Sequence, residues 1–178
     1  FEKSTSKVRE DYNKIVDRTT LGDLTSKKFS INLRSKEGDA IGFQAKPHTD
    51  LIDLEKINYY KVDDFWEKVS PKSNRIVLDP GAFYIFSSQE FVSIPPQLAA
   101  EMAPYLSMIG EFRVHYAGFF DPGFGYSLDK SKKSRAVLEM RCHETPFVLE
   151  HGQTVGKLIF ERMLEEPDIL YGEDLESN

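Results

Sequence analysis

The fold is constrained most by the region from residue 76 to residue 160, where short apolar runs alternate with proline- and glycine-containing turns. One run, Ile76-Val77-Leu78, ends at Asp79-Pro80-Gly81, and a longer run over 112–120 ends at Asp121-Pro122-Gly123. The remaining runs cover residues 83–86, 90–94, 136–142, 147–149 and 155–160. Several short strands with Pro and Gly between them are typical of sandwiches and barrels, so we expect a mainly β fold.

The first part of the chain is more charged and its periodicity is weaker. Phe29–Leu33 and Ile41–Ala45 alternate apolar and polar residues, which predicts two further strands. Residues 63–69 predict a short helix, with Asp63 or Asp64 near its N-terminus. We expect residues 1–26 to form a linker or N-terminal arm and residues 27–178 to form the β domain.

The composition excludes several classes of protein. Apolar residues make up 40% and aromatic residues 12%, which is too apolar for a disordered chain. A net charge of −6 argues against non-specific binding to nucleic-acid polymers or membranes. No run approaches the roughly 18 apolar residues of a membrane span, and no signal peptide is visible. The single cysteine, Cys142, excludes an intramolecular disulfide, so we expect a cytoplasmic protein.

The sequence also lacks several catalytic motifs. A zinc-dependent nucleobase deaminase needs three His or Cys ligands and a Glu, which a chain with one cysteine does not supply. The cluster Cys142-His143-Glu144 does not converge on a strand, where adjacent side chains point to opposite faces. There is no P-loop, no Gly-x-Gly-x-x-Gly and no Gly-x-Ser-x-Gly. We therefore expect no zinc and no metal ligands, and phosphate contacts only from scattered basic groups and backbone amides.

Three segments carry most of the functional information: residues 114–125, 135–140 and 151–161. The first predicts a strand that runs into a tight turn at Asp121-Pro122-Gly123. In the second, alternation places Val137 and Glu139 on the same face of a strand. A carboxylate among apolar residues is partly desolvated and therefore a stronger base. Taken singly, the segments favour an ordinary hairpin turn and a solvated glutamate.

Taken in order, the three segments resemble the dCTP deaminase and dUTPase superfamily, and dCTP deaminases more closely. Members have a strand ending in Asp-Pro-Gly-aromatic, a strand ending in Leu-Glu, and a Gly-x-x-Ile/Val-Gly-x-Leu-x-Phe strand. The resemblance covers about residues 76–163, and Ser30-Ile31-Asn32-Leu33-Arg34 is similar to the family's early strand. It implies a distorted β-barrel or jelly roll (a dUTPase-like β-clip) with few short helices. It also implies a homotrimer or pseudo-trimer with active sites between subunits, residues 27–178 being the dCTP deaminase-like domain.

The resemblance assigns roles to individual residues. Glu139 matches the general base that activates water for attack on C4 of cytosine, without zinc. The residues matched to substrate binding are His115, Tyr116 and Ala117 at the base edge, Asp121 near the sugar, Phe124 after the turn and Tyr171 in the C-terminal tail. The implied reaction is hydrolytic deamination of dCTP to dUTP and ammonia in pyrimidine deoxynucleotide metabolism. Mg²⁺ is expected to accompany the triphosphate.

The sequence departs from the family in the segment that binds the phosphates. The family reads Arg-Ser-Ser-x-x-Arg-x-Gly, whereas residues 103–113 keep Ser107 and Gly110 and lack both arginines and the serine pair. Because family sites are shared between subunits, a second family domain can supply the missing Arg/Ser segment. We hypothesise that the chain is the C-terminal half of a double-length deaminase. The basic residues at 130–135 are a solvated hairpin tip or substitute phosphate contacts.

Three alternatives remain open at this stage. A dUTP pyrophosphatase on the same fold needs an aspartate within the base-reading strand, and the first acid after Ala117 is Asp121. A bifunctional deaminase and pyrophosphatase would carry out both steps. A non-catalytic, nucleotide-binding half-domain is supported by the missing Arg-Ser-Ser segment.

Overall fold

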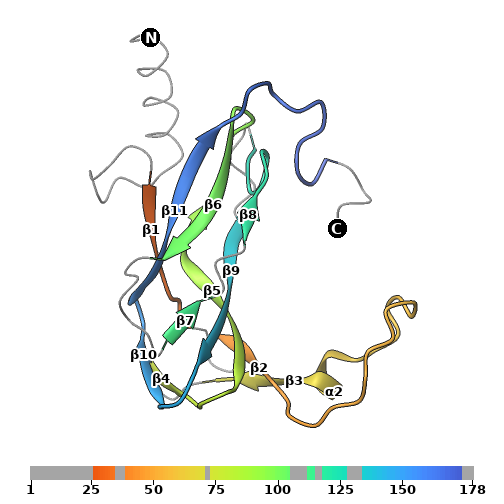
Figure 1. Cartoon of the computed structure of the whole chain (residues 1–178), viewed down its shortest axis with the longest axis vertical. Helices are drawn as coiled ribbons and strands as arrows, with labels where there is room; N and C mark the ends of the chain where they lie inside the picture. Colours follow the sequence, from red (N-terminus) through yellow and green to blue (C-terminus); the bar gives the residue numbers. More distant parts are fainter. Residues whose placement is uncertain are drawn as a thin grey trace.

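The computed structural model describes residues 26–34, 39–70, 73–104, 112–114, 118–127 and 134–173. The predicted arm over 1–26 lies outside the described residues except for Ser26, and the domain boundary at 27 stays a prediction. The described residues form eleven strands and one short helix, which confirms the mainly β fold. Their strands pair in three sheets rather than in one closed barrel (Figure 1).

The four-stranded sheet contains the first and the last of the described strands. Its order is β1-β11-β6-β8, and all its pairs are antiparallel. The strands are β1 (Ser26–Ser30), β6 (Leu98–Pro104), β8 (Phe119–Phe120) and β11 (Thr154–Arg162). Strand β6 was not predicted, and the predicted strand at 29–33 begins earlier because residues 26–30 pair with β11.

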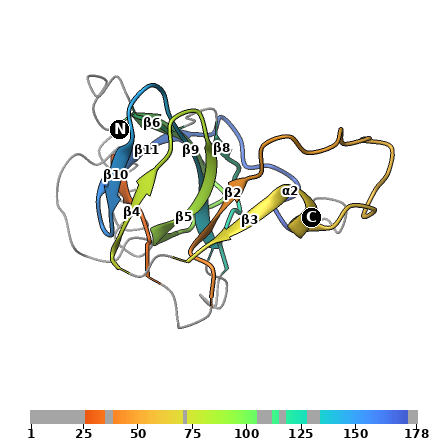
Figure 2. The same cartoon turned by 90° about the horizontal axis from the view of Figure 1, so that it is seen from below.

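The five-stranded sheet carries Glu139. Its order is β3-β2-β5-β9-β7, so β9 lies between β5 and β7. The strands are β2 (Gly42–Ala45), β3 (Trp66–Val69), β5 (Phe83–Val92), β7 (Phe112–Val114) and β9 (Ser134–Cys142). The third sheet pairs β4 (Arg75–Leu78) with β10 (Phe147–Glu150). Figure 2 shows how the strands surround the interior of the domain. The core includes Phe29, Phe86 and Leu138.

Three sequence predictions are wrong in detail. The predicted helix over 63–69 is α2 (Val62–Phe65) only, because residues 66–69 pair with β2 as a strand. The separate strands predicted at 83–86 and 90–94 are the single strand β5, which continues through a register shift. The long run 112–120 is divided between β7 and β8, which belong to different sheets.

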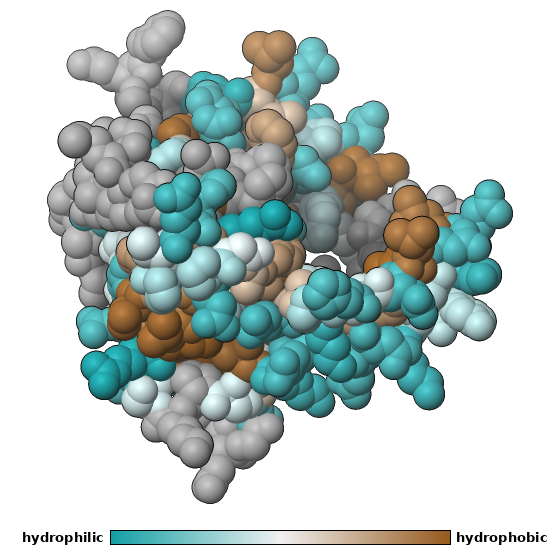
Figure 3. All heavy atoms as spheres, turned by 60° about the horizontal axis from the view of Figure 1, so that its bottom comes forward, coloured by the Kyte–Doolittle hydropathy of each residue, from teal (hydrophilic) through white to brown (hydrophobic). Residues whose placement is uncertain are grey.

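Between β2 and β3, the segment 46–65 projects from the body of the domain (Figures 1 and 2). Tyr60 stiffens it, since its hydroxyl accepts a hydrogen bond from the Asp53 N–H over 2.8 Å. Leu51, Leu54 and Ile57 on this segment are 93%, 88% and 83% exposed. Figure 3 shows apolar side chains at the surface on this side of the molecule.

The register shift in β5 is stabilised by a buried hydroxyl. Ser88 is fully buried; its Oγ donates to the Glu90 carbonyl over 2.7 Å and accepts from the Ala136 N–H over 2.9 Å. The Arg135 guanidinium donates to the Ser88 carbonyl over 2.6 Å and also to the Gln89 carbonyl. These bonds satisfy backbone groups that the interrupted ladder leaves unpaired.

We expect Ser88→Ala to lower the free energy of unfolding by about 1–3 kcal/mol, because it leaves a buried N–H without an acceptor. Urea denaturation measures the change, and Ser87→Ala is the matched control because Ser87 points away from the core. A loss for Ser88→Ala no larger than that of the control would contradict this account of the register shift.

Candidate active site

Glu139 lies in the middle of β9 on the face of the sheet that points away from the core. Ala136, Leu138 and Met140 are buried, whereas Val137 is 62% exposed and Glu139 is half-buried. The predicted division of β9 into an apolar inner face and a second face with Glu139 is therefore confirmed. The carboxylate is neither fully enclosed nor fully solvated.

Among the described residues, apolar, aromatic and basic side chains lie near Glu139 on this face. Ile85 of β5 lies directly opposite Glu139, and Phe83 lies opposite Arg141. The Arg141 guanidinium lies 4.9 Å from the centre of the Phe83 ring, and the Trp66 ring lies 6.0 Å from the same ring. This face thus offers a proton acceptor beside aromatic surface and a cation. Arg141 was not among the predicted site residues, although its position two residues after Glu139 on a predicted strand was the available signal.

The residues predicted to contact the base edge lie outside the described residues. These are His115, Tyr116 and Ala117. The described part of β7 ends at Val114, which pairs with Met140, the residue after Glu139. The described part of β7 therefore ends one residue short of the position opposite Glu139.

The predicted tight turn after β8 is confirmed, and we define the Asp121 turn as residues 121–125. The Phe124 N–H donates to the Asp121 carbonyl over 3.1 Å, and Gly123 and Gly125 have φ of +99° and +61°. Asp121 is exposed. The turn is packed against the Ser134 end of β9, because a Cβ on Gly125 would lie 3.0 Å from the Ser134 Cβ.

The structure brings some predicted site residues together and separates others. The rings of Phe124 and Tyr171 lie 5.4 Å apart, so Tyr171 contacts the Asp121 turn. Glu139 lies five residues along β9 from Ser134, roughly 16 Å on an extended strand. The point at which Gly125 meets Ser134 is therefore distant from Glu139 along β9.

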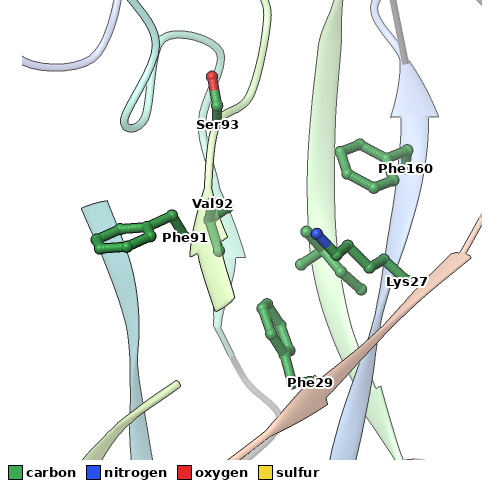
Figure 4. Close-up of a pocket in the computed structure, with 7 residues that line it drawn as sticks. Lys27, Phe29, Phe91, Val92, Ser93 and Phe160 are labelled. Atoms are coloured by element: carbon green, nitrogen blue, oxygen red, sulfur yellow. The ribbon is translucent and has the colours of Figure 1, made fainter. Parts of the chain in front are cut away.

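Two surface depressions lie away from Glu139. One, of about 10 Å³, lies between β1, β5 and β11; Figure 4 shows Phe29, Val92, Lys27 and Phe160 around it. That volume holds about one water molecule and no nucleotide. The other, of about 250 Å³, is lined by Ser73, Asn74, Arg75, Glu150 and His151. Neither depression is lined by Glu139, Asp121, Phe124 or Tyr171.

The described residues contain no group of three or more His, Cys, Asp or Glu that could hold a metal ion. Cys142 is buried and its thiol lies 3.1 Å from the Asp79 carbonyl, whereas His143 and Glu144 are exposed. The three adjacent residues therefore do not converge. In the same part of the chain, no helix has the length and apolar character needed to cross a membrane.

His151 is held in place by a backbone hydrogen bond. Its Nδ1 accepts a hydrogen bond from the Leu33 N–H over 3.2 Å. Desolvation, and then the charge of Arg34, lower the pKa of His151 below its ordinary value. This residue links the β10–β11 turn to the segment after β1.

The lowered pKa of His151 predicts a pH dependence of stability. As the pH falls through about 6.5, the unfolded chain takes up the His151 proton before the folded chain does, so the free energy of unfolding falls. We expect His151→Gln to flatten this decline between pH 7 and 5, measured by urea denaturation. His143→Gln, at an exposed position, is the control. An equal slope in wild type and His151→Gln would contradict the assignment.

Comparison with known proteins agrees with the fold and with the resemblance to dCTP deaminases. The family described as "2'-deoxycytidine 5'-triphosphate deaminase (DCD), C-terminal domain" matches residues 3–178. The crystal structure of 2'-deoxycytidine 5'-triphosphate deaminase from Agrobacterium tumefaciens is similar, with a TM-score of 0.81 and 46% identity over 97% of this chain and 50% of that chain. A "dCTP deaminase, dUMP-forming" from Methanobrevibacter smithii is 30% identical over 71% of this chain and 61% of that protein. One from Streptomyces avermitilis is 29% identical over 62% of this chain and 56% of that protein. The chain thus spans half to about three-fifths of these relatives.

Proposed function

This chain belongs to the family of the C-terminal domain of 2'-deoxycytidine 5'-triphosphate deaminase, and we propose that it deaminates dCTP on the outer face of β9. In the proposed reaction the oxygen of water bonds to C4 of cytosine, the bond from C4 to the amino nitrogen breaks, and ammonia leaves. The product is a uracil nucleotide. The relatives named dCTP deaminase support a reaction of this class.

The position of Glu139 is the observation that carries the proposal. It is a half-buried carboxylate on a rigid central strand, opposite Ile85 and beside the exposed Val137. In the proposed mechanism Glu139 accepts a proton from the attacking water and returns it to the departing amino group. A positioned carboxylate can move this proton without a metal ion at the base.

The positions of the sugar and of the base edge are proposed relative to Glu139. We place the sugar near Asp121 and Phe124, and the base edge against residues 115–117. A role of Tyr171 in binding substrate stays a prediction. The described residues offer no cluster of metal ligands, so Mg²⁺ in this proposal is held by the triphosphate itself.

The phosphate side of the site is proposed to come from a second family domain, in a homotrimer or pseudo-trimer. The chain lacks the Arg-Ser-Ser segment, and it covers only half of the similar Agrobacterium tumefaciens chain. The outer face around Glu139 includes the exposed Val137 and the half-buried Phe83 and Ile85. Such a surface suits a partner domain that packs over it and encloses the nucleotide.

A bifunctional enzyme is the second candidate, because two similar relatives are named dUMP-forming. Formation of dUMP adds a second hydrolysis, in which water attacks the α-phosphate and pyrophosphate leaves. Asp121 is an exposed acid within the proposed site. In this second proposal, Asp121 directly follows β8 and begins the turn that we place near the sugar.

Product analysis tests the proposal. The full-length protein is incubated with dCTP, and separately with dUTP, in the presence of Mg²⁺, and products are separated by anion exchange. Ammonia with dUTP from dCTP supports the deaminase, and ammonia with dUMP supports the bifunctional enzyme. Conversion of dUTP to dUMP with dCTP left unchanged contradicts deamination. Binding of dCTP without turnover indicates a non-catalytic half-domain.

A further inference from the structure

The Asp121 turn is held on its inner side by Ile94, which lies two residues after the end of β5. The Gly123 N–H donates to the Ile94 carbonyl over 2.9 Å, and the Ile94 N–H donates to the Phe124 carbonyl over 2.9 Å. This pair of hydrogen bonds fixes the backbone of the turn relative to the core, since Ile94 is fully buried.

The outer side of the turn is held by the C-terminal strap, which we define as residues 163–173. The Tyr171 N–H donates to the Pro122 carbonyl over 2.9 Å, and the Tyr171 ring lies against the Phe124 ring at 5.4 Å. A Cβ on Gly123 would lie 2.7 Å from the Leu170 Cβ. The strap therefore lies directly on the turn, at a position where only glycine leaves room for it.

The strap is anchored to the domain before this contact and is closed by a turn of its own around Tyr171. The Met163 N–H donates to the Gln97 carbonyl over 3.0 Å, and the Gln97 side-chain amide donates to the Glu166 carboxylate over 2.8 Å. Further along, the Glu173 N–H donates to the Leu170 carbonyl, and the Leu170 N–H donates to the Glu173 carboxylate. Tyr171 is thus presented to the turn by a segment with its own hydrogen bonds.

A row of rings connects the core to Tyr171. The ring centres of Phe29 and Phe120 lie 6.2 Å apart, and those of Phe120 and Phe124 lie 5.2 Å apart. Phe29 is fully buried, whereas Tyr171 is 45% exposed. Phe124 therefore has the core on one side and Tyr171 on the other, and ring pairs of this kind stabilise the contacts they make.

We propose that Tyr171 is a positioning residue, which acts on the site through Phe124 and the Pro122 carbonyl by fixing the turn that presents Asp121. This proposal rests on the proposed function, because it takes Asp121 to lie near the sugar. Tyr171 then affects the reaction without touching the nucleotide. Direct contact of its exposed ring with substrate is the competing explanation, and the experiments below separate the two.

The first experiment needs no substrate. In hydrogen exchange on the full-length protein without nucleotide, we expect Tyr171→Ala to raise the exchange rates of the Gly123 and Phe124 amides about tenfold. Tyr171→Phe keeps the ring and is expected to keep wild-type protection. Leu164→Ala is the control within the strap, because Leu164 is 103% exposed. Unchanged protection of the turn in Tyr171→Ala would overturn the proposal, whatever the protein does to dCTP.

The second experiment is a double-mutant cycle with Asp121. We expect Tyr171→Ala to raise the KM for dCTP about tenfold, and the double variant with Asp121→Asn to be no worse than Asp121→Asn alone. Additive losses would show that Tyr171 contacts the nucleotide independently and would overturn the proposal. If Tyr171→Ala loosens the turn in a protein that leaves dCTP unchanged, the positioning role stands and the proposed function fails.

Discussion

Glu139→Gln is expected to lower kcat for dCTP deamination by roughly 10²- to 10⁴-fold while nucleotide binding persists. Glutamine is nearly the same size as glutamate, so the packing beside Ile85 and Val137 is retained. It cannot accept the proton of water, however, and the proposed mechanism has no other acid on this face of β9. The effect is therefore expected in kcat and not in the dissociation constant of dCTP.

Steady-state ammonia release and equilibrium binding of dCTP to full-length Glu139→Gln separate these two quantities. Glu101→Gln is the matched control, since Glu101 is an exposed strand glutamate on β6 in the other large sheet. The control is expected to keep wild-type turnover. Near wild-type kcat in Glu139→Gln would remove Glu139 from the role of general base.

Gly125→Ala is expected to lower the free energy of unfolding by about 2–4 kcal/mol. Gly125 has a φ of +61°, which strains any residue with a Cβ. The added Cβ would also lie 2.2 Å from the Val92 carbonyl oxygen, a backbone atom that cannot rotate away. The turn must move away from β5, and Asp121 must move with it.

Gly81→Ala is the control that separates strain from steric overlap. Gly81 has a φ of +74°, but a Cβ at this position would meet no atom within 4 Å, so only the conformational strain applies. Thermal and urea denaturation of both variants measure the difference. A loss for Gly125→Ala no larger than that for Gly81→Ala would show that the turn is not packed against β5 as described.

Patterns along a single strand were predictable, because side-chain alternation is a local property. The alternation around Glu139 assigned the two faces of β9 correctly, and the turn at Asp121 followed from its Asp-Pro-Gly sequence. Strand β6 was missed because its sequence, Leu98–Pro104, consists largely of Leu, Ala, Glu and Met, which favour helix in isolation. Its pairing with β11 overrides that preference.

Contacts between distant segments were not predictable from one sequence. The contact of Tyr171 with Phe124 depends on the path of the C-terminal strap, for which the sequence carries no periodic signal. The continuity of β5 depends on hydrogen bonds of Ser88 and Arg135, which replace the interrupted ladder. From residue spacing alone, this interruption predicts two separate strands. The placement of Ile85 opposite Glu139 likewise follows from the order of the strands in the sheet.

The fate of labelled oxygen tests the central claim most directly. The full-length protein is incubated with dCTP and Mg²⁺ in heavy-oxygen water, and the nucleotide products are analysed by mass spectrometry. Attack of water on C4 predicts one heavy oxygen in the uracil base of the product, together with release of ammonia. Heavy oxygen found only in the phosphates, with the cytosine base intact, would contradict deamination and assign the chain to phosphate hydrolysis instead.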